Sequence, residues 1–254
     1  MKPLIETNVW QVLRRFTPAR IALGRAGDSL PTTALLDFGL AHAQARDAVH
    51  APLDVAAIQQ QLIAAGYDSI AVRSTVADRN EYLRRPDFGR CLDEASRAQL
   101  LAQMTSTPPQ LVFVIADGLS AMAAMHHAVS LLQAVHAQLT DWTLAPIIIA
   151  EHARVALGDA IGELLNAEQV VMLIGERPGL SSPHSLGIYL TYAPHIGRID
   201  AERNCISNVR PEGLSYAQAA HRLVYLLNGA RRLGRSGIAL KDDSDQVVVT
   251  KAHS

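Results

Sequence analysis

The run Leu111-Val112-Phe113-Val114-Ile115-Ala116 is apolar without interruption and leads directly into Asp117-Gly118-Leu119-Ser120. A short apolar run that ends in turn residues is typical of a strand buried on both faces of a sheet. Over residues 120–139 the sequence then favours a long helix. A buried strand that leads into a helix is the repeating unit of α/β proteins.

The same alternation continues toward the C-terminus. Strands are predicted over 146–150, 170–174 and 187–192, and helices over 159–165 and 215–233. Fully apolar strands that alternate with helices indicate a mostly parallel sheet with helices on both faces. The predicted fold class is therefore α/β.

The first hundred residues are predicted to be mainly helical. Four helices are expected there, over residues 8–16, 32–49, 54–65 and 96–104. One short strand is expected over residues 70–72. Pro108-Pro109 marks the change of pattern. We therefore divide the chain into a mainly helical N-terminal region, 1–107, and an α/β domain, 108–254.

Composition excludes several classes of protein. The chain has 254 residues, 49% hydrophobic and 19% charged, so it has ample material for a core and is not a disordered protein. Its net charge of −1 excludes a strong attraction to nucleic acid or to an anionic membrane. Residues 118–140 lack Asp, Glu, Lys and Arg, but their histidines and glutamines would be costly in lipid, so we expect a buried helix. Two cysteines and no visible signal peptide indicate a reducing cytoplasm.

Ligands of open parallel sheets bind beyond the carboxyl ends of the strands. The loops expected at that edge are residues 117–120, 151–155 and 175–180. Each contains a carboxylate that could accept hydrogen bonds from a polar ligand. For Asp117, capping of the following helix is an equal alternative. In the last loop Gly175 and Pro178 constrain the backbone around Glu176 more than a simple turn requires, which favours function there.

Cys205 is a further candidate, because it lies among polar residues of 203–208, just past the last predicted strand. A buried, inert thiol is the alternative. The adjacent pair His126-His127 would point its rings about 100° apart on a helix, so helix histidines without a metal are the favoured interpretation. The common dinucleotide, P-loop, nucleophile-elbow and metal-binding patterns do not occur in the sequence. We therefore assign no catalytic and no metal-binding residue.

Five segments together resemble the small (light) subunit of ethanolamine ammonia-lyase. They occur in the family's order, span roughly residues 15–237, and read T-P-A-R-I-A-L-G-R-A-G at 17–27, D-R-N-E-Y-L-R-R-P-D-F-G-R at 78–90, D-G-L-S at 117–120, G-E-R-P-G-L at 175–180 and C-I-S-N at 205–208. The resemblance implies a Rossmann-like domain that contacts adenosylcobalamin. The family's light-chain contacts to this cofactor correspond to Val155, Glu176 and Cys205.

The resemblance also implies a division of labour. A large subunit, a TIM barrel, holds ethanolamine, and cobalt–carbon homolysis starts the radical reaction that releases acetaldehyde and ammonia. The light subunit covers the corrin from the other side, so this carbon–nitrogen lyase is expected to be a hetero-oligomer and the present chain to be inactive alone. The D-x-H-x-x-G pattern of other cobalamin proteins is absent, in agreement with a family that keeps the cofactor's own base on cobalt.

Some members of this family carry a longer N-terminal segment that is linked to packaging in a bacterial microcompartment. Here about a dozen residues precede the helix end at Arg14-Arg15, so we expect a cytoplasmic protein, with the microcompartment as the second location. Two other functions stay open. One is a stand-alone Rossmann-like enzyme that uses a nucleotide, against which the absent glycine fingerprint counts, and the other is a non-catalytic assembly subunit.

Overall fold

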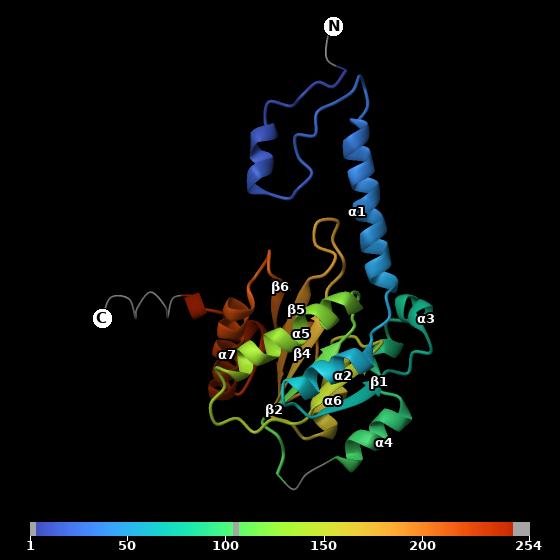
Figure 1. Ribbon diagram of the computed structural model, residues 1–254. Coiled ribbons are helices and arrows are strands. Elements are labelled where there is room, and N and C mark those ends of the chain that lie inside the picture. The colour runs from blue at the N-terminus through green and yellow to red at the C-terminus, as the bar shows by residue number, and fades with distance from the viewer. Residues whose placement is uncertain (1–3, 104–106, 246–254) are drawn as a thin grey trace, which may run out of the picture.

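A computed structural model describes residues 4–103 and 107–245, and within them one mixed sheet has the order β1-β3-β2-β4-β5-β6 (Figure 1). The strands are β1 Ser69–Arg73, β2 Leu111–Ala116, β3 Ile147–Glu151, β4 Gln169–Gly175, β5 Leu186–Tyr192 and β6 Arg203–Val209. The helices are α1 Thr32–His50, α2 Val55–Ala64, α3 Arg79–Arg84, α4 Glu94–Ala102, α5 Ala121–His136, α6 Leu157–Leu164 and α7 Tyr216–Leu233. Short 3-10 helices are η1 Gln11–Phe16, η2 Phe88–Arg90, η3 Asp200–Glu202 and η4 Gly237–Ala239.

The α/β class is confirmed, and helices cover both faces of the sheet. One core cluster joins α2, α5 and α7 to residues such as Phe113 and Leu173, whereas the other joins α4 and α6 to Val114 and Met172. Successive strand residues point to opposite faces, so an uninterrupted apolar run such as β2 supplies both clusters at once. All six residues of β2 are buried.

The expected mostly parallel sheet is correct only for part of the molecule. Strands β1, β3, β2 and β4 pair in parallel, but β5 pairs antiparallel with β4, and β6 pairs antiparallel with β5. No helix lies between β4 and β5, and a direct return of this kind makes an antiparallel neighbour, whereas a parallel one needs a longer crossover.

Strand β6 corrects a second expectation, because residues 203–208 were predicted to follow the last strand. In this strand only Arg203, Ile206 and Val209 are buried, and Cys205 is exposed. A strand at a sheet edge with few buried side chains has no continuous apolar run, so its sequence resembles that of a loop.

The N-terminal segment stands apart from the sheet (Figure 1). The predicted helix over 32–49 is confirmed as α1, but it buries only Ala41 and Ala48. Several large apolar side chains of the segment are exposed, among them Val9, Trp10, Val12, Phe16, Leu35, Leu36, Phe38 and Leu40.

The division at residue 108 stays a prediction. Strand β1 and helix α2, which precede residue 108, take part in the sheet and its core. The predicted helix over 96–104 corresponds to α4, and Met104 lies outside the described residues. The charged stretch 78–90 contains α3, which was not predicted. Among the described residues, no helix is long and apolar enough to cross a membrane.

Candidate functional site

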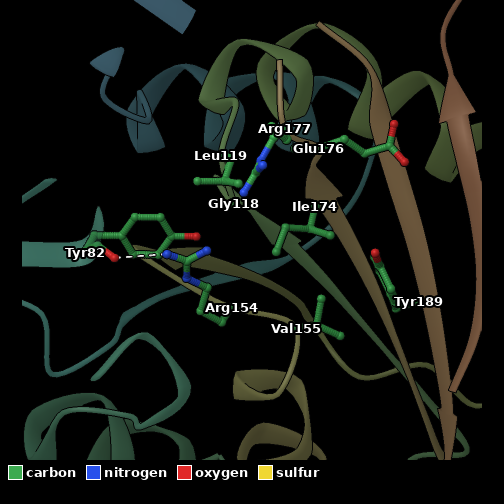
Figure 2. Close-up of a pocket in the computed structure, with 10 residues that line it drawn as sticks. Tyr82, Gly118, Leu119, Arg154, Val155, Ile174, Glu176, Arg177 and Tyr189 are labelled. Atoms are coloured by element: carbon green, nitrogen blue, oxygen red, sulfur yellow. Dashed lines mark hydrogen bonds between the residues drawn. The ribbon is translucent and has the colours of Figure 1, made fainter. Parts of the chain in front are cut away.

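A pocket of about 460 Å³ lies beyond the carboxyl ends of β2, β3 and β4 (Figure 2). Its lining residues come from the three loops singled out in the sequence, from α3, and from strands β4 and β5: Tyr82, Gly118, Leu119, Arg154, Val155, Ile174, Gly175, Glu176, Arg177 and Tyr189. Val155 and Glu176, which are far apart in the sequence, therefore share one cavity. Cys205 is not among the lining residues, but it faces Tyr189 across the β5–β6 ladder.

The first and third loops touch through their backbones. The amide of Leu119 donates a hydrogen bond to the carbonyl of Gly175 over 2.9 Å, and Gly118 has a φ of +52°. A Cβ atom on Gly175 would lie 2.0 Å from the carbonyl oxygen of Ser120. Because no side chain fits there, this glycine brings the two ligand-edge loops together.

Asp117 ties these loops together from the inside. It is 2% exposed and accepts hydrogen bonds from the amides of Gly118, His152 and Ala153, over 2.9–3.0 Å, and from Arg79, over 3.1 Å. Burial raises the pKa of Asp117 to about 6, although these donors favour its charged form. Its oxygens are thus occupied within the protein, and Ser120 provides the cap of α5.

Tyr82 and Arg154 form one wall of the pocket. Tyr82 is fully buried and its hydroxyl donates to the carbonyl of Ala153 over 3.0 Å. The guanidinium of Arg154 lies 4.0 Å from the centre of the Tyr82 ring, and its Nη2 donates to the Tyr82 carbonyl over 3.0 Å (Figure 2). Gly89 permits this packing, since a Cβ there would lie 2.9 Å from Cγ of Arg154.

The carboxylate of Glu176 lies at the side of the pocket toward β5 and β6 (Figure 2). It accepts a 2.5 Å hydrogen bond from the hydroxyl of Ser185, and the amide of Asn208 lies 3.2–3.3 Å from its two oxygens. Glu176 is half-buried. Each carboxylate oxygen can accept more than one hydrogen bond, so acceptor capacity remains for a ligand.

Cys205 is exposed on β6, so the alternative of a buried thiol is wrong. Its sulfur lies 3.3 Å from the hydroxyl of Ser207. Burial raises the pKa of Tyr189, and the neighbouring Cys205 adds to that effect. Val155 follows β3 in a loop, whereas Tyr189 and Cys205 face each other within β5 and β6, so an aliphatic and an aromatic group line the pocket and a thiol lies next to the aromatic one.

No group of three or more His, Cys, Asp or Glu suited to a metal ion occurs in residues 4–103 and 107–245. In the pair His126-His127, the ring nitrogens of His127 make hydrogen bonds with the hydroxyl of Tyr216 over 2.7 Å and with the carbonyl of His184 over 2.9 Å. These contacts give His127 a structural role.

Sequence reasoning did not single out Tyr82, Arg154 or Tyr189 as lining residues. Tyr82 lies within the family segment D-R-N-E-Y-L-R-R-P-D-F-G-R, and Arg154 lies in the predicted ligand-edge loop 151–155, directly before Val155, so the sequence contains a signal for both. Tyr189 lies in a predicted strand, where an aromatic residue is unremarkable without knowledge of its neighbours.

The family model described as ethanolamine ammonia-lyase light chain (EutC) matches residues 7–241. A protein of Pseudomonas fluorescens (strain Pf0-1) named ethanolamine ammonia-lyase small subunit is 55% identical over 247 residues, which cover 95% of this chain and 90% of that protein. The protein of the same name in Pseudomonas syringae pv. tomato is 57% identical, with 93% and 84% covered. That of Ralstonia nicotianae is 55% identical, with 95% and 91% covered. With this match along almost its whole length, the chain belongs to the ethanolamine ammonia-lyase light chain family.

Proposed function

We propose that this chain is the small subunit of an adenosylcobalamin-dependent ethanolamine ammonia-lyase, and that it holds and shields the corrin cofactor while a large TIM-barrel subunit holds ethanolamine. One observation carries the proposal. Val155 and Glu176 line a single pocket at the ligand edge of the sheet, and Cys205 lies beside it, opposite Tyr189. The family resemblance had assigned cofactor contact to these three residues.

The chemistry of the pocket fits such a cofactor. Cobalamin has an apolar ring system surrounded by amide side chains. Val155, Ile174 and Leu119 offer apolar contact, and Glu176 can accept hydrogen bonds from amide N–H groups. Adenosylcobalamin would supply the radical chemistry that converts ethanolamine to acetaldehyde and ammonia, and the protein residues would supply binding, orientation and exclusion of water.

The chain's own residues act by position. Glu176 is held by Ser185 and Asn208, so its carboxylate is oriented before any ligand arrives. We assign no proton transfer to this chain. Cofactor contact belongs mainly to the proposed domain 108–254, and Tyr82 joins it from the preceding region.

The exposed apolar side chains of α1 support the role of a subunit. Leu35, Leu36, Phe38 and Leu40 lie within two turns of one helix and are all exposed in the single chain. A cluster of exposed apolar groups of this kind marks a surface that another protein covers. In the proposed enzyme, the large subunit is the protein that covers these side chains.

Co-expression with an ethanolamine ammonia-lyase large subunit tests the proposal. The purified complex is incubated with adenosylcobalamin, gel-filtered, and examined by ultraviolet–visible spectroscopy and by an acetaldehyde assay. We expect retained cobalamin absorbance and turnover by the complex, and no acetaldehyde from this chain alone. A complex that is active without retaining cobalamin, or turnover by this chain alone, would contradict the proposal. A complex without bound cofactor and without activity would instead favour an assembly subunit.

A further inference from the structure

We propose that Arg154 and Arg177 form an anion subsite in the pocket and bind the phosphodiester group of the cofactor's nucleotide tail. This inference rests on the proposed function, since it names the part of the cofactor that this wall of the pocket recognises. Both arginines line the same cavity as Val155 and Glu176. Figure 2 shows the side chain of Arg177 directed toward Gly118 and Arg154, whereas the carboxylate of Glu176 points to the other side.

Arg154 is held in place but is not fully paired. The ring of Tyr82 and the Tyr82 carbonyl fix one side of the guanidinium, at 4.0 Å and 3.0 Å. Its Nε atom is buried and has no hydrogen-bond partner among the described residues. Because Nε is covered by protein atoms, a ligand in the pocket cannot reach it. The nitrogen that is available to an anion is Nη1, which makes no hydrogen bond within the described residues, on a guanidinium that lines the pocket.

Arg177 brings a second positive charge to the pocket from the opposite loop. It is exposed and lies on the segment between Glu176 and Pro178. The one carboxylate in the lining belongs to Glu176, and it already accepts hydrogen bonds from Ser185 and Asn208. Two cations that face one cavity repel each other, and a bound anion relieves that repulsion.

The identity of the anion follows from the chemistry of the cofactor. Cobalamin carries amides, hydroxyl groups and a single anionic group, the phosphodiester that links its nucleotide tail to the corrin. Arginine presents several donors in one plane and binds phosphate oxygens with charge-assisted hydrogen bonds. A neutral amide carbonyl could satisfy one N–H group but would leave both positive charges uncompensated. Glu176 therefore suits the amide groups, and the two arginines suit the phosphodiester.

Cobinamide separates binding of the amides from binding of the phosphodiester, because it keeps the corrin with its amide side chains but lacks the nucleotide tail and its phosphodiester. The complex with the large subunit is titrated with hydroxocobalamin and with aquocobinamide, and binding is followed by the absorbance of the corrin. Arg154→Met is expected to weaken cobalamin binding by about tenfold to a hundredfold and to leave cobinamide binding unchanged. Arg177→Gln, at an exposed position, is expected to weaken cobalamin binding by about threefold.

Arg232→Gln is the matched control, since Arg232 is an exposed arginine on α7 away from the pocket and from α1. It removes the same charge and is expected to change neither affinity. Thermal unfolding of every variant checks the fold, and Arg177→Gln tests the inference even if Arg154→Met unfolds. Equal losses for both ligands, or no loss with either arginine variant, would overturn the anion subsite. If the unsubstituted complex binds neither ligand, the proposed function itself fails and the subsite fails with it.

Discussion

At the scale of single residues, Glu176 has two tasks. Its carboxylate ties the loop after β4 to Ser185 and to the end of β6 at Asn208, and it also faces a pocket suited to a ligand. Such a carboxylate stabilises the loop in the free protein through hydrogen bonds within the chain. It stabilises the complex as well, because it can accept hydrogen bonds from the ligand. Substitution therefore affects binding more than chemistry.

Glu176→Gln keeps the size of the side chain but removes its charge and turns one acceptor into a donor. We expect cobalamin to bind about tenfold more weakly in the two-chain complex, because hydrogen bonds to a charged group contribute roughly 1.5–3 kcal/mol. The maximal rate at saturating cofactor should barely change, since the contact is the same before and during the reaction. A cofactor titration of turnover measures both quantities.

Glu94→Gln, on the exposed start of α4, serves as the control for this substitution. Unchanged cofactor affinity in Glu176→Gln would contradict the anchoring role. A large loss of maximal rate with intact affinity would contradict it as well.

The burial of His127 predicts how the stability of the protein depends on pH. Burial lowers its pKa, so the folded protein binds a proton at this ring less readily than the unfolded chain does. The stability that His127 contributes is therefore complete above the unfolded pKa of about 6.5 and is lost as the pH falls below it. Burial lowers the pKa of His152 and His184 in the same direction.

Urea unfolding at pH 7.5 and pH 5.5 measures this effect. We expect the unsubstituted protein to lose unfolding free energy between pH 7.5 and pH 5.5. This loss should be smaller in His127→Gln. His50→Gln, at an exposed position at the end of α1, should keep the unsubstituted protein's difference. An identical pH dependence in His127→Gln and in the unsubstituted protein would show that the ring does not titrate in this way.

At the scale of elements, the pocket depends on how closely the loops after β2 and β4 approach each other. Gly175 meets the backbone of Ser120 and Asp117, and Gly118 meets the backbone of Gly175 in return. Backbone atoms cannot move aside as a flexible side chain can. The positions of Leu119 and Glu176 on either side of the pocket thus depend on two residues without side chains.

Gly175→Ala tests this contact. Its Cβ would lie 2.0 Å from one carbonyl oxygen and 2.5 Å from another, so we expect a loss of about 3 kcal/mol in unfolding free energy. Gly39→Ala, in α1, is the matched substitution because nothing lies within 4 Å of the added atom. There we expect a gain of about 0.5–1 kcal/mol, since alanine favours a helix interior. Chemical denaturation of both variants gives the comparison, and equal effects would contradict the argument from close approach.

At the scale of the whole molecule, stability is unevenly distributed. Helix α5 buries nine residues against the sheet, whereas α1 buries two and extends away from it (Figure 1). Helices in water owe most of their stability to packing of an apolar face, and α1 lacks that packing in the single chain. We therefore expect α1 to open more readily than α5 in the single chain.

Hydrogen exchange of the isolated chain measures this difference. Amides of α1 should exchange with a free energy of opening well below that of global unfolding, and amides of α5 should exchange close to the global value. Addition of the large subunit should slow exchange in α1 if that subunit covers its apolar side chains. Equal protection of α1 and α5 in the isolated chain would contradict the uneven distribution.

The sequence determined those features that depend on neighbouring residues. The uninterrupted apolar runs predicted β2 and β4, the helical periodicity predicted α1, α5 and α7, and the rule for sheet edges placed Val155 and Glu176 at one site. Each of these inferences needs only a local pattern, because burial on one or two faces sets the spacing of apolar residues.

Only the tertiary structure decided which distant segments meet. The antiparallel return of β5 and β6, the strand that carries Cys205, and the contacts of Asp117 with Arg79 and His152 join residues that no periodicity links. The same holds for Arg154. The sequence shows only that this residue is charged, whereas the structure shows that it packs against Tyr82 and lines the pocket. A local pattern reports how deeply a residue is buried, but the choice of partner depends on the free energy of the whole packed chain.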